Sequence, residues 1–239
     1  MYPLCLKAKE VGKLNFDLYK SALPKDLNVV AVGGYYALQT LNSDPKAELV
    51  NLILSNIRDS KGKFDYTDSG KIDALVAILQ SRGKGFNSLT VDGEWTPVLS
   101  RQGKESKKIQ KFFDKGAKIL KAFSNFDAKT LTFENMNYVL GKGVLKAGLK
   151  YVPVPESFSK SIDGKIVLRR IACDIVQASF KFWKFPTLPL PLKRKGGYLD
   201  FLYLDNDIRI TRGNNGGLFV HFRPKYLMKL MSGGGKAKE

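Results

Sequence analysis

The chain of 239 residues has only one histidine, His221, and two cysteines, Cys5 and Cys173. The cysteines lie far apart without a CxxC spacing, so they support neither a disulfide framework nor a cysteine zinc site, and they fit a reducing compartment. The histidine lies between Val220 and Phe222 in an apolar stretch typical of a strand, where it is interpreted as an ordinary strand side chain. No Ser-His-Asp or Cys-His arrangement can be built around it. We therefore expect no catalytic residue, no metal site and no enzyme activity.

The sequence also lacks an apolar run of the roughly 18 to 20 residues that a membrane-spanning helix needs. Its longest apolar stretches are interrupted by Lys, Asp or Pro within a few positions, which predicts a soluble or peripheral protein. Residues 1–10 do not show a charged segment followed by an apolar one and a small-residue cleavage site, so no targeting peptide is legible.

Acidic residues are scarce, with 22 Asp and Glu against 40 Lys and Arg, and the formal net charge is +18. Such a surplus favours an anionic partner, whether nucleic acid, an acidic lipid surface or an acidic protein assembly. Nothing but the charge points to nucleic acid, so we do not expect a nucleic-acid partner. Hydrophobic residues make up 44% of the chain, which is the composition of a folded protein.

Two amphipathic helices are predicted in residues 45–82. Asp44-Pro45 supplies an N-cap and a proline at the first helical position, and apolar residues follow at helical spacing in two successive runs. Residues 1–44 are interpreted as an N-terminal extension, and the Gly- and Lys-rich residues 232–239 as a disordered tail. The apolar positions are Val50, Ile53, Leu54 and Ile57 in the first helix, and Ile72, Leu75, Val76 and Leu79 in the second.

From about residue 94 to residue 223, short apolar segments bounded by Gly, Asn, Asp and Pro predict antiparallel strands. The clearest hairpin joins residues 198–204 to residues 208–212, with Asp205-Asn206-Asp207 as the turn. Consecutive hairpins favour a curled or closed antiparallel sheet, because closure leaves no exposed strand edge. The other candidate strands are residues 95–100, 130–140, 165–175, 178–185 and 218–222.

Aromatic and basic residues are interleaved in residues 180–185, and a Pro-rich segment, residues 186–191, follows them. Proline cannot donate to a central ladder, so this connection should form an exposed edge. The pattern fits a strand with one buried face, a lipid headgroup interface or a surface on which bases stack. The residues of the predicted membrane or partner surface are Lys181, Trp183, Lys184, Phe185, Lys193, Arg194 and Lys195.

Asp200, Asp205 and Asp207 form a carboxylate cluster, but turn chemistry and pairing with a nearby arginine account for it without a metal. Arg209 and Arg212 have opposite parity along a strand, so at most one of them should point into a barrel. An enclosed guanidinium needs a partner. We expect Asp200 or Asp205 to supply it, and we expect replacement of the enclosed arginine by Met to destabilise the fold.

The C-terminal third contains four motifs: Gly197-Tyr198-Leu199-Asp200, Tyr203-Leu204-Asp205, Asp207-Ile208-Arg209-Ile210-Thr211-Arg212-Gly213 and Leu218-Phe219-Val220. Together they resemble the signature of the plastid lipid-associated protein family, the plant and algal fibrillins. The resemblance extends over residues 45–223, where the Pro-rich segment, Gly93-Glu94-Trp95 and the two predicted helices agree with the family. Tyr198 stands where the family usually has Trp.

This resemblance implies a mainly β protein with N-terminal helices, in which a lipocalin-like antiparallel barrel carries helices packed at one end, over residues 45–231. It implies a non-enzymatic protein that binds a lipid, carotenoid or quinone at the thylakoid or plastoglobule surface of a plastid, with no required cofactor. The alternative is a basic accessory or scaffold subunit that docks its barrel on an acidic protein assembly such as a photosynthetic complex. The residues assigned to the ligand pocket or structural signature are Trp95, Tyr198, Asp200, Tyr203, Asp205, Arg209, Arg212 and Phe219.

Overall fold

The computed structural model describes residues 44–58, 66–101, 122–139, 142–160 and 164–233. The chain forms two compact units, Met1–Gly83 with Lys160–Lys165, and Lys84–Ser159 with Ile166–Glu239. Each unit is described by itself. The predicted N-terminal extension, apart from Asp44, and residues 234–239 of the predicted tail lie outside the described residues.

The first unit contains the two predicted helices, α4 (Pro45–Arg58) and α5 (Tyr66–Ser81), which pack against each other. Asp44 caps α4 as expected, because its Oδ1 accepts a hydrogen bond from the backbone N–H of Lys46 at 2.9 Å. The predicted apolar positions of both helices are buried, except Ile57, which is half-buried. Packing of this helix pair at one end of the barrel stays a prediction.

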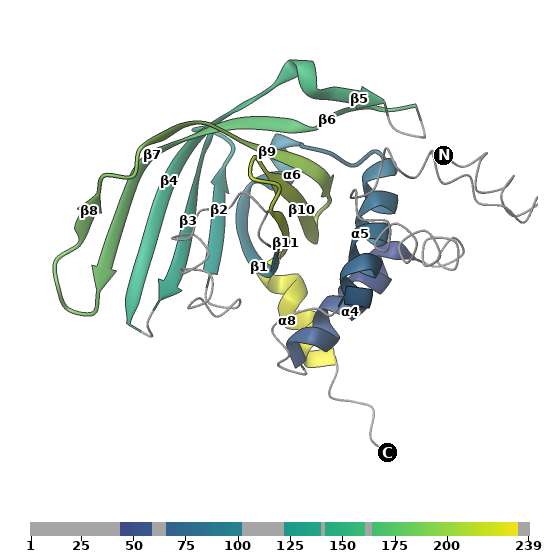
Figure 1. Cartoon of the computed structure of the whole chain (residues 1–239), viewed down its shortest axis with the longest axis horizontal. Coiled ribbons are helices and arrows are strands. Elements are labelled where there is room, and N and C mark those ends of the chain that lie inside the picture. Colours follow the sequence, from purple (N-terminus) through teal and green to yellow (C-terminus); the bar gives the residue numbers. More distant parts are fainter. Residues whose placement is uncertain (1–43, 59–65, 102–121, 140–141, 161–163, 234–239) are drawn as a thin grey trace, which may run out of the picture. The chain divides into compact units, whose positions relative to one another are not determined.

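The second unit is a closed antiparallel β-barrel, as predicted (Figure 1), and the ring consists of eight strands. Each strand pairs with its two neighbours in the order β1-β2-β3-β4-β7-β9-β10-β11, and the pairing of β11 with β1 closes the ring. The strands are β1 (Gly93–Arg101), β2 (Ala122–Asp127), β3 (Thr132–Val139), β4 (Gly143–Pro153), β7 (Arg170–Phe182), β9 (Arg194–Leu204), β10 (Ile208–Gly213) and β11 (Leu218–Phe222).

Several short helices and strands lie outside the eight-stranded ring. Tyr226 of the C-terminal helix α8 lies edge-on to Phe222 of β11, with 5.7 Å between ring centroids. Ser232 belongs to α8, so the predicted disordered tail does not begin there. The additional elements are α6 (Ser88–Val91), the 3-10 turn η3 (Pro155–Ser157), the paired strands β5 (Phe158–Lys160) and β6 (Ile166–Leu168), β8 (Leu188–Leu190) and α8 (Pro224–Gly233).

Two strand predictions were wrong. Residues 165–175 and 178–185 were expected to be separate strands, but β7 runs unbroken from Arg170 to Phe182. The two predicted segments are joined by a β-bulge within this strand. Gly148 pairs with Gln177 and Leu149 pairs with Ile175, so Val176 is the extra residue. Strand β4 was not predicted, although its side chains alternate between apolar and basic over Leu145 to Lys150.

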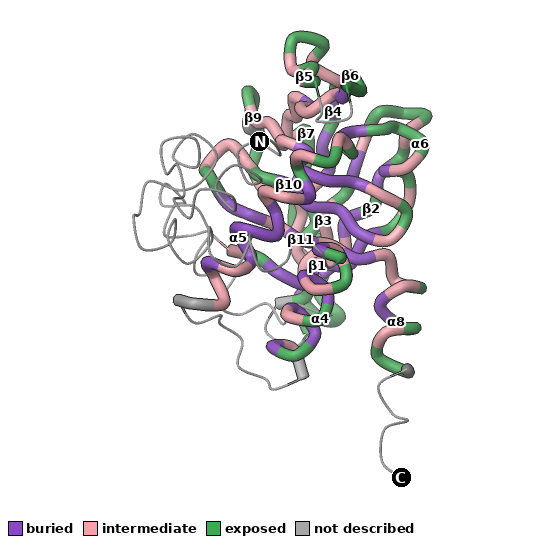
Figure 2. Tube along the Cα trace, turned by 90° about the vertical axis from the view of Figure 1, so that its right-hand side faces the viewer, coloured by how far each residue is buried: buried purple, intermediate pink, exposed green. Residues whose placement is uncertain are grey.

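The barrel interior is packed by aromatic rings at one end. On β4 the inward-facing residues pass from the half-buried Leu145 and Ala147 to Leu149 and Tyr151, which are 8% and 2% exposed. The paired inward positions of β3 follow the same order, from half-buried asparagines to a buried phenylalanine. Figure 2 shows buried residues along β1, β10 and β11. The inward-facing side chains are therefore buried near Tyr151 and partly exposed to solvent toward Leu145.

Candidate functional site

An arginine enters the aromatic end of the barrel. Arg209 of β10 is 2% exposed, and its register partner on β11 is His221. The guanidinium carbon lies 5.3 Å from the ring centroid of Trp95 and 4.8 Å from that of Phe126. Arg212, three residues further on, is exposed. The parity argument is confirmed, because only one of the two arginines is enclosed.

The enclosed arginine has no acidic partner within the described part of the chain. Its Nε and Nη1 are buried and donate to no hydrogen-bond acceptor there. Burial, and after it the positive charge of Arg223, lower the pKa of Arg209 to about 9, so the side chain stays protonated at neutral pH. The expectation that Asp200 or Asp205 would pair with it was wrong, since both carboxylates are engaged elsewhere.

The indole ring of Trp95 packs against the Arg209 guanidinium. The ring is fully buried, and its Nε1–H donates to the carbonyl of Val91 at 2.7 Å. The guanidinium of Arg223 lies 3.8 Å from the ring centroid of Trp95, and it donates to the carbonyls of Glu94 and Thr90 at 3.1 Å and 2.6 Å. Arg223 therefore packs on the tryptophan ring while its N–H groups donate to backbone carbonyls, whereas the Nε and Nη1 of Arg209 have no acceptor among the described residues.

Two further polar atoms in the barrel lack partners among the residues that the structure describes. They are Nδ1 of His221 and the hydroxyl of Tyr151. Desolvation, and next the charge of Arg209, lower the pKa of His221 well below its usual value, so the imidazole is neutral at pH 7. Burial likewise raises the pKa of Tyr151, which stays protonated. Arg209, His221 and Tyr151 are thus one cation and two neutral polar groups, all incompletely hydrogen-bonded among the described residues.

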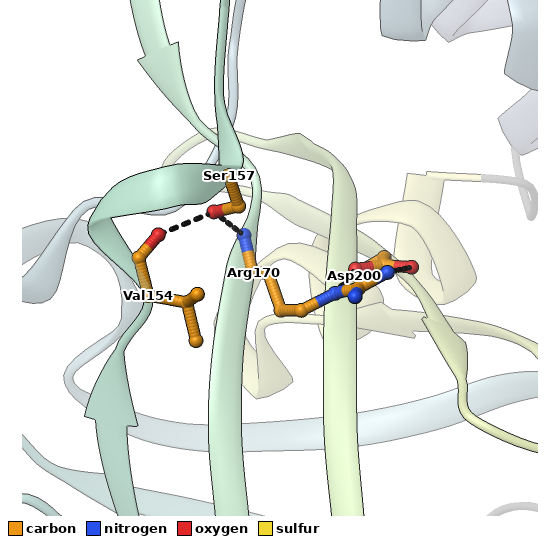
Figure 3. Close-up of polar contacts among 4 residues, drawn as sticks. All are labelled: Val154, Ser157, Arg170 and Asp200. Carbon is orange, nitrogen blue, oxygen red and sulfur yellow. Dashed lines mark hydrogen bonds and ion pairs between the residues drawn. The ribbon is translucent and has the colours of Figure 1, made fainter.

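The signature residues Tyr198 and Asp200 lie on β9 and contact Arg170 of β7, and Figure 3 shows the pairing of Asp200 with Arg170. Arg170 of β7 donates from Nε and Nη2 to the two carboxylate oxygens of Asp200 on β9, at 2.6 Å and 2.9 Å. The guanidinium also lies 3.9 Å from the ring centroid of Tyr198. Ser157 accepts from the backbone N–H of Arg170 at 2.8 Å and donates to the Val154 carbonyl at 2.7 Å. These contacts connect β7 to β9 and to the η3 turn, so their role is structural.

The β9–β10 turn uses the other carboxylate of the signature. Asp205 Oδ1 accepts from the backbone N–H groups of Asp207 and Ile208 at 2.9 Å each, which is the turn chemistry that the sequence predicted. Its Oδ2 accepts from the hydroxyl of the buried Tyr203 at 2.9 Å. Phe219 is half-buried on β11 opposite Thr211. The structure therefore brings Trp95 and Arg209 together and leaves Tyr198, Asp200, Asp205 and Arg212 outside their cluster.

The basic-aromatic segment forms an exposed edge at the end of the sheet, which we call the β7–β8 edge (Figure 1, left of the view). Strand β8 pairs with β7 at Phe180 and Leu188, and it is the last strand of the sheet order. The predicted edge placement of the Pro-rich segment is confirmed. The exposed apolar side chains of the β7–β8 edge are Phe182, Trp183, Phe185, Leu188 and Leu192.

Cations border these apolar side chains. The Nζ atoms of Lys142 and Lys184 lie 4.5 Å and 5.6 Å from the ring centroid of Trp183. Lys181, Lys193 and Lys195 are exposed as well, while only the backbone of Arg194 is described. Phe182 stacks with Phe180 and with Phe185 at 6.4 Å each, which gives the β7–β8 edge a continuous aromatic face.

Sequence reasoning missed three residues of the interior cluster: Phe126, Tyr151 and His221. Period-2 alternation could have placed Tyr151, because it continues the apolar series of β4. The register of β11 against β10, which turns a histidine toward Arg209, is a long-range property that no local pattern contains.

Neither a membrane-crossing helix nor a metal-binding cluster is found where the structure is described. No helix there is long and apolar enough to span a bilayer. No group of three or more His, Cys, Asp or Glu side chains in those ranges could hold a metal ion.

Comparison with protein families matches residues 46–221 to the family described as PAP_fibrillin. The match covers well over half of the 239 residues and includes the barrel and both helices of the first unit. Comparisons with curated proteins and with solved structures give no match.

Proposed function

Because the chain belongs to the PAP/fibrillin family, we propose that it is a non-enzymatic plastid lipid-associated protein whose barrel binds a hydrophobic small molecule such as a lipid, carotenoid or quinone. The observation that carries this proposal is the interior of the barrel. Eight strands give a barrel wide enough to hold one small ligand. The apolar lining with few polar groups is the usual lining of such sites.

The partly exposed side chains of the interior support the same function. Ala147 and Ile175 pack against the aromatic core and yet are only partly buried. An apolar ligand that extended along these side chains would cover apolar surface that water now reaches, at about 25 cal/mol for each Å² removed from water.

The β7–β8 edge supports a peripheral location at a thylakoid or plastoglobule surface. Its aromatic and leucine side chains are more than one third exposed, and lysines surround them. Aromatic and apolar tips can insert shallowly while lysines meet anionic headgroups, each basic contact contributing about 1 kcal/mol near such a surface. The edge would then place the barrel beside the source of its ligand.

A second candidate function is favoured by the net charge of +18. In this alternative the protein is an accessory or scaffold subunit, and its basic surface docks on an acidic protein assembly of the plastid. Such docking weakens sharply as ionic strength rises. Insertion of the β7–β8 edge into lipid would retain an apolar, salt-resistant component.

The proposed function is tested by native mass spectrometry and solvent extraction of the full chain after incubation with a thylakoid lipid extract. We expect one apolar molecule per chain. A protein that emerges free of lipid, carotenoid and quinone, with unchanged thermal stability, would contradict the proposal. Flotation with phosphatidylglycerol liposomes at low and high salt separates the two functions, because complete release at high salt supports electrostatic docking on protein.

A further inference from the structure

Arg209 stands out among the arginines because it is both deeply buried and unpaired. Arg170 is 40% exposed at its side chain and has a bidentate carboxylate partner. Arg209 is 2% exposed, and its Nε and Nη1 have no partner among the described residues. A buried, uncompensated guanidinium costs several kcal/mol of desolvation. An anion paired with the guanidinium would reduce this cost, and the described residues do not supply one.

The surroundings of Arg209 determine what kind of anion fits. The rings of Trp95 and Phe126 contact the guanidinium and provide no hydrogen-bond acceptor in their planes. His221, directly opposite on β11, is neutral, and so is Tyr151 in the same aromatic cluster. Arg223, which lies over Trp95 as well, donates to backbone carbonyls; burial lowers its pKa, and the negative charge of Asp92 acts on it against that effect. One unpaired positive charge beside neutral polar groups matches a single negative charge.

Within the proposed ligand-binding function, on which this inference rests, we propose that the barrel binds an amphipathic ligand with a carboxylate headgroup, and that Arg209 pairs with this carboxylate at the aromatic end. The apolar body of a long-chain fatty acid would extend toward Ala147 and Leu145, where the inward-facing side chains are partly exposed to solvent. The Nδ1 of His221 faces the same interior and can donate or accept one further hydrogen bond.

A carboxylate is favoured over a phosphate monoester because the charges then balance. A phosphate monoester carries about −1.5 to −2 at pH 7, and one guanidinium neutralises only part of it. In a site with little access to water, the excess negative charge would stay uncompensated. A neutral carotenoid or quinone, in turn, would leave the charge of Arg209 uncompensated.

The test measures binding of oleate and of methyl oleate to the full-length protein. These probes share one hydrocarbon chain and differ in charge. The protein contains two tryptophans, so the variant W183F leaves Trp95 as the single fluorophore, beside the Arg209 guanidinium. In this background we expect oleate to bind about 10- to 100-fold more tightly than methyl oleate, which is the factor typical of hydrogen bonds to a charged group.

Substitutions then assign the discrimination to Arg209. R209M should bind oleate and methyl oleate with equal affinity, and R209K should retain part of the preference. R212M is the matched control, because Arg212 is on the same strand and exposed. It should preserve the full preference. Retained binding of methyl oleate by R209M shows that the variant folds and that its barrel still holds an apolar ligand.

The orientation is tested with two brominated acids, because bromine quenches tryptophan at short range. With W183F, 2-bromopalmitate should quench Trp95 strongly and 16-bromohexadecanoate weakly. The reverse order would overturn the proposed orientation. Tighter binding of oleyl phosphate than of oleate would overturn the carboxylate assignment.

Two outcomes separate this inference from the proposed function. Equal affinity for oleate and methyl oleate in the W183F protein would overturn the inference while the barrel remained a binder of apolar molecules. Failure of both probes, and of every lipid in the thylakoid extract, to bind would contradict the proposed function as well.

Discussion

Arg209 and His221 face each other across neighbouring strands inside the barrel, and each has buried nitrogen atoms without a partner in the described structure. Their proximity explains part of the electrostatics, because the charge of Arg209 adds to desolvation in lowering the pKa of His221. Both residues are costly to enclose in this way. We attribute their presence to ligand binding, and the predictions below separate that role from a contribution to stability.

The first prediction concerns the stability of R209M in the absence of ligand. The desolvation cost of Arg209 is several kcal/mol, whereas its contacts with two aromatic rings return on the order of 2 kcal/mol. Met fills a similar volume without a charge. Urea unfolding should therefore show R209M to be at least as stable as the wild type, by about 1 kcal/mol or more. This reverses the sequence-based expectation, which assumed an aspartate partner.

A clear loss of stability in ligand-free R209M would mean that Arg209 is a structural residue. The matched control is R170M, in which the lost guanidinium has a carboxylate partner and an aromatic ring. R170M should lose stability.

The second prediction is a pH dependence due to His221. Its pKa in the folded protein lies well below 6.5, so the unfolded chain binds the proton more readily. The stability that this difference provides is present above about pH 6.5, and it is lost as the pH falls from there toward the folded pKa. The slope approaches 1.4 kcal/mol per pH unit at most, that is, about one proton.

Urea unfolding of the wild type and of H221Q between pH 7.5 and pH 5 measures this effect. The difference between the two proteins should change with pH by roughly 1 kcal/mol, because the carboxylates titrate alike in both. Parallel curves for the two proteins over this range would show that folding does not lower the pKa of His221, which would contradict its burial beside Arg209.

The third prediction concerns the β7–β8 edge. The variant K193E/R194E/K195E should lose binding to phosphatidylglycerol liposomes by about 3 kcal/mol, roughly 100-fold, if each residue contributes about 1 kcal/mol. The control K129E/K150E/K225E changes the net charge equally at exposed lysines elsewhere on the barrel unit and should bind nearly as well as wild type. Equal flotation of the two triple variants would show that the edge contributes only through the net charge of the protein.

The fourth prediction concerns the ion pair of Arg170 and Asp200. Because the pair is bidentate and partly exposed, a double-mutant cycle with R170M and D200N should give a coupling free energy of about 1 kcal/mol. Oleate affinity should stay unchanged in D200N. A specific loss of oleate binding in that variant would place Asp200 in the ligand site.

Local patterns in the sequence were sufficient for the helices, the C-terminal hairpin and the edge position of the Pro-rich segment. Each depends on spacing or on turn residues within about ten positions, as with Asp205 and the two N–H groups that it accepts. The partner of the enclosed arginine could not be predicted in this way. Asp200 lies only nine residues before Arg209 in the sequence, but register places it opposite Arg212 on β10 and Arg170 on β7.

Strand β4 shows a different limit. Leu145, Ala147, Leu149 and Tyr151 alternate with Lys146 and Lys150, but Gly143 and Gly148 interrupt the pattern and made the strand hard to predict. A Cβ at Gly148 would lie 2.8 Å from the side chain of Gln177 across the bulge of β7, so that side chain would have to shift. This close contact exists only once β4 and β7 are paired.

The most direct measurement is the ¹H–¹⁵N NMR signal of the Arg209 Nε–H during addition of oleate. The signal is identified by its absence in R209K, and burial should protect it from exchange with water. We expect it to shift on addition of oleate, in proportion to the ligand bound, and to stay in place on addition of methyl oleate. An Arg209 Nε–H signal that does not move while oleate binds to the protein would contradict the pairing of Arg209 with a carboxylate.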